Sequence, residues 1–327
     1  MLTSIRTDAE IEIHGLEKAR AAIGVYADTL RETGETLMPM VAGFVAVCVN
    51  CFGNYVLIFG NFGAPELGVV GAAVATVASR FVELAILILY TWTHRARHKF
   101  IVGAFRRLFR VDGPLMRQIA LRGTPLLINE ALWSIGMSAL TQCYSTRGLT
   151  TVAGFNIANT IINVFNISYF ALGTSVGIII GKYLGAGDYE RAEREDRQLI
   201  AFAVVVGAVM GTILFVTAPL FPRLYNTTEE ARALATRVLR VAALYTPIPA
   251  YLHACYFTIR SGGKTLITFF FDSGFVCAFA YPIILILTRT TALSSVVLYA
   301  ICSALDLVKV VIGYILLKKK GWISKIV

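Results

Sequence analysis

The sequence predicts an all-α integral membrane protein with about eight transmembrane helices. Of its 327 residues, 57% are apolar and 15% are charged, whereas about 25% of the residues in a typical soluble domain are charged. The charged residues gather in a few segments, which separate apolar stretches of about 20 residues or more. Because hydrocarbon offers the backbone no water, such stretches must form helices or a closed barrel, and the alternating pattern of a barrel is absent.

Eight apolar spans follow one another along the chain. They cover residues 37–60, 68–91, 124–144, 150–181, 199–220, 238–258, 265–288 and 292–317. An even number of spans places both ends of the chain on one side of the membrane. Lys and Arg concentrate on the cytoplasmic side of membrane proteins, and here they are most abundant in the segments that share a side with the termini. We therefore expect both termini to be cytoplasmic and the protein to lie in the plasma membrane.

The net charge of +10 does not indicate binding of nucleic acid, because the basic residues form no surface stripe with exposed aromatic residues. The six cysteines all lie in apolar spans, where thiols usually act as small packing residues. The chain has no His-Glu-x-x-His, Gly-x-Ser-x-Gly or phosphate-loop motif. The lipid bilayer is therefore an expected partner, and we expect no enzyme activity, metal or cofactor.

The charged segments divide the chain into five parts. Residues 1–36 form a cytoplasmic N-terminal segment, 37–91 hold two spans, 92–122 form a cytoplasmic linker, 123–317 hold six spans and 318–327 form a basic cytoplasmic tail. The linker marks a domain boundary between the two groups of spans.

The linker also has an amphipathic pattern. Ile101, Phe105 and Phe109 share one helical face, with Arg106 and Arg107 beside them. This pattern predicts a helix that lies on anionic lipid. An ordinary basic loop is the alternative.

Two similar heptapeptides precede the first and the seventh spans. Leu30–Thr36 and Ile259–Thr265 both read apolar-Arg-x-x-Gly-x-Thr, and both are followed by two spans. Parallel internal repeats are common in secondary transporters. Four spans separate the linker from the second copy, but none precedes the first. The repeat therefore predicts one complete six-helix lobe plus the last two helices of the other lobe, in a chain truncated at its N-terminus.

Glu130, inside the third span, is the clearest candidate for a functional residue. Ionisable groups within a bilayer are costly and often mark transport pathways. Ser134, Ser138 and Thr141 follow at helical spacing and form one polar stripe with Glu130. Because desolvation favours the neutral acid, Glu130 is suited to take up a proton or to coordinate a cation. The alternative is a structural carboxylate that bonds to a neighbouring helix.

The fourth span carries four amides on one helical face, at spacings of three and four residues: Asn156, Asn159, Asn163 and Asn166. Amides are costly against lipid, so this face meets either another helix or a watered cavity. The nearby Glu130 stripe favours a cavity.

Two more ionisable residues lie within spans. His253 follows a bend at Thr246–Pro249, where Pro247 and Pro249 interrupt the helix. This histidine serves gating or proton transfer, or it is a packed side chain without a role in transport. Asp272, about two turns into the seventh span, is within reach of a cavity or of its inner mouth.

Acid–base pairs recur on the last helix of each predicted lobe. Arg80 and Glu83, like Asp306 and Lys309, are three residues apart. Each pair is able to neutralise itself on one helical face. We interpret both pairs as structural.

The segment Gly63–Thr76 resembles the signature that enters the sixth helix of MATE (multidrug and toxic compound extrusion) transporters. The Gly-Ala-Gly-Asp turn at 185–188, the two Arg-x-x-Gly-x-Thr loops and the Glu130 segment match the same family in the same order. The resemblance runs from about residue 30 to the C-terminus. It implies two six-helix bundles around a central cavity, in a monomer that exports amphipathic cations in exchange for protons or Na⁺.

The resemblance also assigns a role to Glu130, which matches the acidic position on the family's seventh helix. The acidic residue that is common on the tenth helix is absent here, where the chain reads Pro247–His253. This difference favours protons over Na⁺ as the coupling ion.

Three alternatives remain at this point. A flippase for a lipid-linked glycan needs a basic cavity, whereas the intramembrane groups here are mainly amides and carboxylates. A membrane enzyme that uses His253 and Asp272 needs the two side chains to face each other. A shortened chain that transports nothing is the third.

Overall fold

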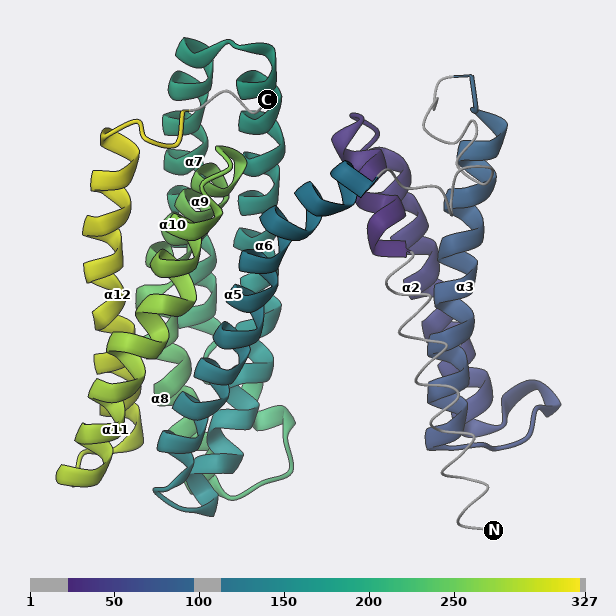
Figure 1. Cartoon of the computed structure of the whole chain (residues 1–327). Coiled ribbons are helices and arrows are strands. Elements are labelled where there is room, and N and C mark those ends of the chain that lie inside the picture. Colours follow the sequence, from purple (N-terminus) through teal and green to yellow (C-terminus); the bar gives the residue numbers. More distant parts are fainter. Residues whose placement is uncertain (1–22, 97–112, 324–327) are drawn as a thin grey trace. The chain divides into compact units, whose positions relative to one another are not determined.

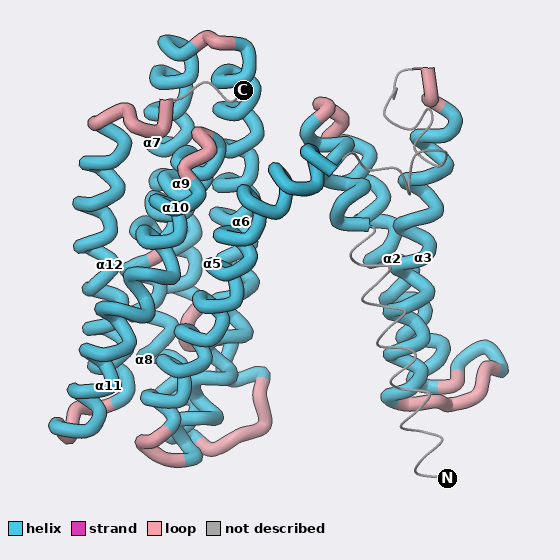
Figure 2. Tube along the Cα trace, viewed as in Figure 1, coloured by secondary structure: helices cyan, strands magenta, loops and turns pink. Residues whose placement is uncertain are grey.

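The computed structural model describes residues 23–96 and 113–323. All regular structure in these two ranges is helical (Figures 1 and 2), which confirms the predicted all-α class. The chain divides into two compact units, residues 1–112 and 113–327. The predicted amphipathic helix of the linker and most of the predicted segment 1–36 lie outside the described residues.

Six helical stretches of the described chain are long and apolar enough to cross a membrane: α2 (Leu37–Phe59), α3 (Val69–Thr93), α6 (Leu149–Ala186), α7 (Tyr189–Thr217), the run Thr265–Thr290 and α12 (Ser295–Lys318). These six coincide with six of the eight predicted spans, so the protein is a multi-pass membrane protein.

The other two predicted spans are helical but different in character. The span at 124–144 lies within α5 (Gly113–Ser145), which begins with a polar segment. The span at 238–258 is divided between α8 (Glu229–Tyr245) and α9 (Pro247–Ser261). Pro247 has no backbone N–H to continue the α8 ladder, so each part is short.

In the first unit, α2 and α3 pack side by side along their lengths. Small residues permit this close approach: a Cβ added at Gly71 would lie 2.5 Å from the Leu57 carbonyl oxygen. A helix at residues 23–32 buries Leu30 against Leu87 of α3. Within these described residues, the helix therefore completes a small three-helix core.

The two Arg-x-x-Gly-x-Thr heptapeptides adopt the same local structure. In each, the glycine N–H donates to the carbonyl oxygen of the Arg three residues earlier, over 3.0 Å from Gly34 to Arg31 and 2.9 Å from Gly263 to Arg260. Both glycines have positive φ, 98° and 75°, which glycine adopts without steric cost. Each turn ends one helix and precedes another, so the sequence repeat is also a repeat of structure.

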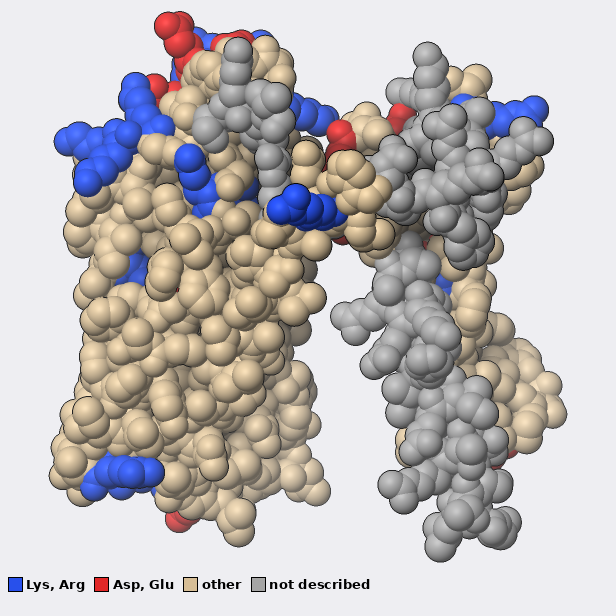
Figure 3. All heavy atoms as spheres, in the orientation of Figure 1, with Lys and Arg blue, Asp and Glu red and all other residues tan. Residues whose placement is uncertain are grey.

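The second unit is a bundle in which α6 packs against α7, α8 and α9, while α12 covers α8 and α9. Figure 3 shows most of the visible Lys and Arg of this unit at the end where α6, α9 and α12 terminate, and mainly uncharged atoms over its middle. Such a distribution is typical of a bundle that crosses a bilayer.

The bend between α8 and α9 packs closely against α7. A Cβ at Gly207 would lie 2.7 Å from that of Ala250, and a Cβ at Gly211 would lie 2.5 Å from the Ala243 carbonyl oxygen. The absence of side chains at these two glycines lets α7 follow the bent helix.

The run Thr265–Thr290 is not a uniform α-helix. Between α10 (Thr265–Phe269) and α11 (Tyr281–Thr290) lie two π-helical segments, η4 (Phe270–Gly274) and η5 (Val276–Ala280). Wide turns of this kind often occur at functional sites. The first of them carries Asp272.

Candidate functional site

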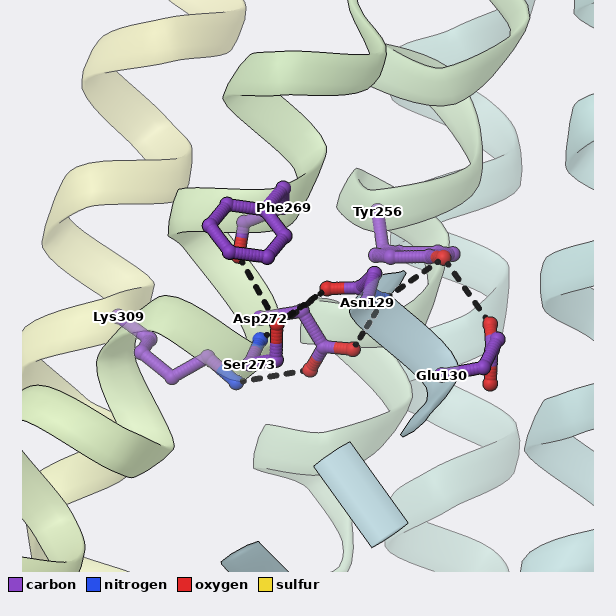
Figure 4. A network of polar contacts seen from close by, with 7 residues as sticks. All are labelled: Asn129, Glu130, Tyr256, Phe269, Asp272, Ser273 and Lys309. Atoms are coloured by element: carbon purple, nitrogen blue, oxygen red, sulfur yellow. Dashed lines mark hydrogen bonds and ion pairs between the residues drawn. The ribbon is translucent and has the colours of Figure 1, made fainter. Parts of the chain in front are cut away.

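Asn129 of α5 lies at the centre of a network of polar contacts inside the second unit (Figure 4). Its side chain is fully buried, and its Nδ2 donates to Asp272 Oδ2 over 3.2 Å and to Tyr256 Oη over 3.4 Å. Its Oδ1 accepts from the Ser273 backbone N–H over 3.3 Å and from Ser273 Oγ over 2.7 Å. A buried amide with both ends bonded stabilises one arrangement of α5, α9 and η4.

The π-helical turn explains how two consecutive residues reach the same amide. The Ser273 N–H donates out of the helix to Asn129, while Ser273 Oγ lies 3.4 Å from the Phe269 carbonyl oxygen, four residues back. A side chain that inserts into a helical ladder in this way distorts the helix. Asn129 therefore satisfies a backbone group at the point where the helix widens, and Asp272 lies beside it.

Lys309 of α12 forms an ion pair with Asp272, with 3.6 Å between Nζ and Oδ1. Lys309 is only 8% exposed, and its Nζ also lies 5.5 Å and 5.8 Å from the ring centroids of Phe271 and Phe275. Both rings are within the range of cation–π attraction.

The predicted pairing of Lys309 with Asp306 is therefore wrong in this state. No ion pair joins Asp306 to any residue in the described ranges, although it is three residues from Lys309. The long Lys309 side chain reaches across to η4 instead, where a carboxylate held by Asn129 and two aromatic faces attract it. By contrast, Arg80 and Glu83 on α3 do form an ion pair, at 2.7 Å.

Glu130 is exposed although its neighbour Asn129 is buried, because consecutive residues of an α-helix point about 100° apart. Glu130 Oε1 accepts from Tyr256 Oη over 3.4 Å. Figure 4 shows the resulting chain of contacts from Lys309 through Asp272, Asn129 and Tyr256 to Glu130. One end is the ion pair of Lys309 with the partly buried Asp272, and the other end is the exposed Glu130.

The remaining members of the predicted cavity are also on the surface of the second unit. Ser134 is exposed one turn after Glu130, and the four amides of α6 alternate between exposed and half-buried: Asn156, Asn159, Asn163 and Asn166. Within the part of the chain that the structure describes, no side-chain hydrogen bond joins these amides to another helix. The structure therefore does not show the amides as interhelical glue within this unit.

His253 packs between aromatic rings. Its ring centroid lies 5.1 Å from that of Tyr169 and 4.3 Å from that of Phe170, both in edge-to-face geometry. Asp272 bonds to Asn129 and pairs with Lys309, so the described contacts do not bring His253 and Asp272 together. These contacts therefore give no support to the alternative of a catalytic pair.

Asp196 is a buried acid that the sequence did not single out. It is 3% exposed on α7 and accepts a hydrogen bond of 2.6 Å from Thr258 Oγ1 of α9. Asp196 lies in the charged segment that begins α7, where an acid is unremarkable. Its spacing from Ala192 and Ile200, which are both buried, was the available signal for a residue on the core face.

The fold and this network define a class: a polytopic helical membrane protein with ionisable groups placed within its bundle. Residues 125–279 match the family model described as MatE. This segment contains Asn129, Glu130, Tyr256, Asp272 and Ser273 of the network.

Curated relatives and solved structures agree with that match. The chain is 29% identical over 247 residues to "Probable multidrug resistance protein NorM" of Thermotoga maritima, covering 75% of this chain and 52% of that protein. It is 26% identical over 241 residues to "Probable multidrug resistance protein YoeA" of Bacillus subtilis, covering 74% and 52%. The chain thus spans about half the length of these relatives.

Two solved structures share the fold. The Vibrio cholerae MATE transporter VcmN in the bent form has a TM-score of 0.77 at 16% identity, covering 95% of this chain and 69% of that one. A MOP superfamily transporter from Pyrococcus furiosus has a TM-score of 0.78 at 19% identity, covering 91% and 65%. The chain therefore has the fold of these transporters, and its residues 125–279 match the MatE family model.

Proposed function

We propose that this chain is the larger part of a multidrug exporter in the plasma membrane, with both termini in the cytoplasm. In this proposal, the protein exports amphipathic organic cations, such as drugs and other xenobiotics, in exchange for protons. The names of the relatives, which are multidrug resistance proteins, support the substrate class. One complete lobe comprises α5–α12, with α8 and α9 as one bent span, and α2 and α3 are the last two helices of the other lobe.

The observation that carries the proposal is the exposed carboxylate of Glu130 in the mainly apolar stretch Leu126–Trp133, in which Asn129 is the other polar residue. Among the described residues, no ion pair involves Glu130, and Tyr256 supplies its one side-chain hydrogen bond, at 3.4 Å. An ionised carboxylate is costly against lipid. We therefore infer that this face of α5 lines a watered transport pathway, where Glu130 is free to bind a proton or a cationic substrate.

Exchange follows because a proton and an organic cation compete for the Glu130 carboxylate. A proton on Glu130 neutralises the carboxylate and removes its attraction for an organic cation, whereas the ionised form restores it. If the two ligands exclude each other, a proton that enters down its gradient drives a cation outward.

The uncharged polar groups of the same surface suit this class of substrate. Exposed Ser134 and the amides of α6 offer hydrogen bonds without positive charge, and Asn156 and Asn163 are the most open of them. A lipid-linked glycan carries phosphate and needs cationic partners. The described surface of α5 between Glu130 and Thr141 and that of α6 between Asn156 and Asn166 contain no Lys or Arg, which favours cation export over glycan flipping.

The test is gradient-driven efflux of a cationic dye from proteoliposomes, reconstituted with the natural protein that includes this chain. A pH gradient should drive efflux by the wild type, and Glu130→Gln should abolish it. Glu230→Gln, which changes an acid in the first turn of α8, is the matched control and should leave efflux unchanged. Efflux that persists in Glu130→Gln, or that needs a Na⁺ gradient instead, would contradict the proposal.

A further inference from the structure

We propose that Asp272 and Lys309 form a second proton-binding site, at which a proton and the Lys309 ammonium compete for the Asp272 carboxylate. Proton uptake then moves Lys309 from Asp272 to Asp306 and releases α12 from η4. The binding site stands on its own geometry, and only its role in transport rests on the function proposed above.

Lys309 is held by charge rather than by hydrogen bonds. An ammonium carries three N–H donors, yet the nearest carboxylate oxygen lies 3.6 Å from Nζ, beyond the roughly 2.7–2.9 Å of a charge-assisted hydrogen bond. Its other described contacts are the faces of Phe271 and Phe275. A buried ion pair with such geometry contributes little net stability, so a competing ligand is able to break it.

The two oxygens of Asp272 have different partners. Asn129 Nδ2 donates to Oδ2, and Lys309 faces Oδ1. A proton that binds to Oδ1 therefore neutralises the carboxylate that attracts Lys309, and the hydrogen bond from Asn129 to Oδ2 remains. The Asp272 side chain is 22% exposed, so a proton is able to reach it.

Asp306 provides the alternative partner for Lys309. The two residues are three apart on α12, which places them on one helical face. Lys309 and Asp272 both act electrostatically on Asp306, and none of the described hydrogen bonds or ion pairs occupies its carboxylate. When Asp272 becomes neutral, the Lys309 ammonium is therefore attracted to a second carboxylate, that of Asp306 on the same helix.

This arrangement has two states with different consequences for the bundle. In the observed state, the ion pair of Lys309 and Asp272 ties α12 to η4. In the protonated state, the charge balance lies within α12, and the helices are joined only by packing. The net charge of the three groups changes from −1 to zero, because the incoming proton remains on Asp272.

Other titratable groups surround the three residues, so variants are needed to distinguish their titration from that of Asp272. They are Glu130 on α5 (through Tyr256), Tyr169 on α6, His253 and Tyr256 on α9, and Tyr299 and Cys302 on α12.

Infrared difference spectroscopy during a pH titration tests the proposal, because it detects the carbonyl stretch of a protonated carboxylic acid. The sample is the full chain in nanodiscs of phosphatidylethanolamine and phosphatidylglycerol. The wild type should show a titrating carboxylic-acid band that Asp272→Asn removes and Glu130→Gln retains.

Two further variants should shift this band in opposite directions. Lys309→Met removes the competitor, so the proton should bind about ten- to a thousandfold more tightly. Asp306→Asn removes the alternative partner of Lys309, so the proton should bind more weakly. Circular dichroism confirms folding, and Lys309→Arg, which keeps the charge, should retain a titrating band.

A purely structural ion pair would give no titrating band that depends on Asp272, and this result would overturn the inference. Equal shifts in Lys309→Met and Asp306→Asn would overturn the competition. The proposed transport function fails separately: dye efflux that survives Glu130→Gln contradicts that function but leaves the Asp272 band in place.

Discussion

Asn129 on α5 and Ser273 in η4 are 144 residues apart in the sequence, yet their side chains meet at 2.7 Å. The same Asn129 oxygen also accepts the Ser273 backbone N–H. This contact stabilises the widened turn that carries Asp272, and it links that turn to the helix that carries Glu130. The exposed acid and the buried ion pair therefore share one structural support.

Replacing Asn129 with Leu should destabilise the second unit. The substitution removes the acceptor of the buried Ser273 N–H, at a cost of about 1–3 kcal/mol, and it removes the donor to Asp272 Oδ2. Thermal unfolding of the purified protein in detergent measures the effect. Asn163→Leu is the control, because this exposed amide has no described side-chain hydrogen bond, and equal loss of stability in the two variants would contradict the account.

Thr258→Val should also destabilise the protein, because it deprives buried Asp196 of its hydrogen-bond donor at almost constant volume. The expected loss is about 1–3 kcal/mol, read as a lower denaturation midpoint. Thr160→Val removes an exposed hydroxyl whose described bond is to the Asn156 carbonyl oxygen, and it should have little effect. A Thr258→Val protein as stable as the wild type would show that the Asp196 contact is dispensable.

Gly211→Ala tests the packing of α7 against the bend between α8 and α9. The added methyl group would lie 2.5 Å from the Ala243 carbonyl oxygen, so the helices must separate, at a cost of about 1–3 kcal/mol. The measurement is the yield of monodisperse protein together with its unfolding temperature. Gly185→Ala, where nothing lies within 4 Å of the added carbon, is the matched control; a neutral Gly211→Ala would refute the close packing.

Local patterns were enough to predict much of the fold. Apolar spans between basic segments gave six of the membrane helices, and Pro247 located the bend between α8 and α9. The repeated heptapeptides form similar turns, in which Gly34 and Gly263 both have positive φ. These features could be predicted because they depend on residues that are close together in the sequence.

The contacts between side chains of the site could not be predicted from the sequence in the same way. Asp306 is the nearest acid to Lys309 along α12, but the tertiary structure brings Asp272 to it from another helix. Asn129 went unnoticed beside the charged Glu130, because its role depends on a π-helical turn that hydropathy does not reveal. Contacts between distant segments decided both cases, and a single sequence carries no direct signal for them.

The central claim is that a proton and an organic cation compete for Glu130. The most direct measurement is proton release from the purified natural protein in weakly buffered detergent when tetraphenylphosphonium binds, with binding measured separately by calorimetry. The account predicts release from the wild type and none from Glu130→Gln. Equal release from both proteins, or binding to the wild type without release, would contradict it.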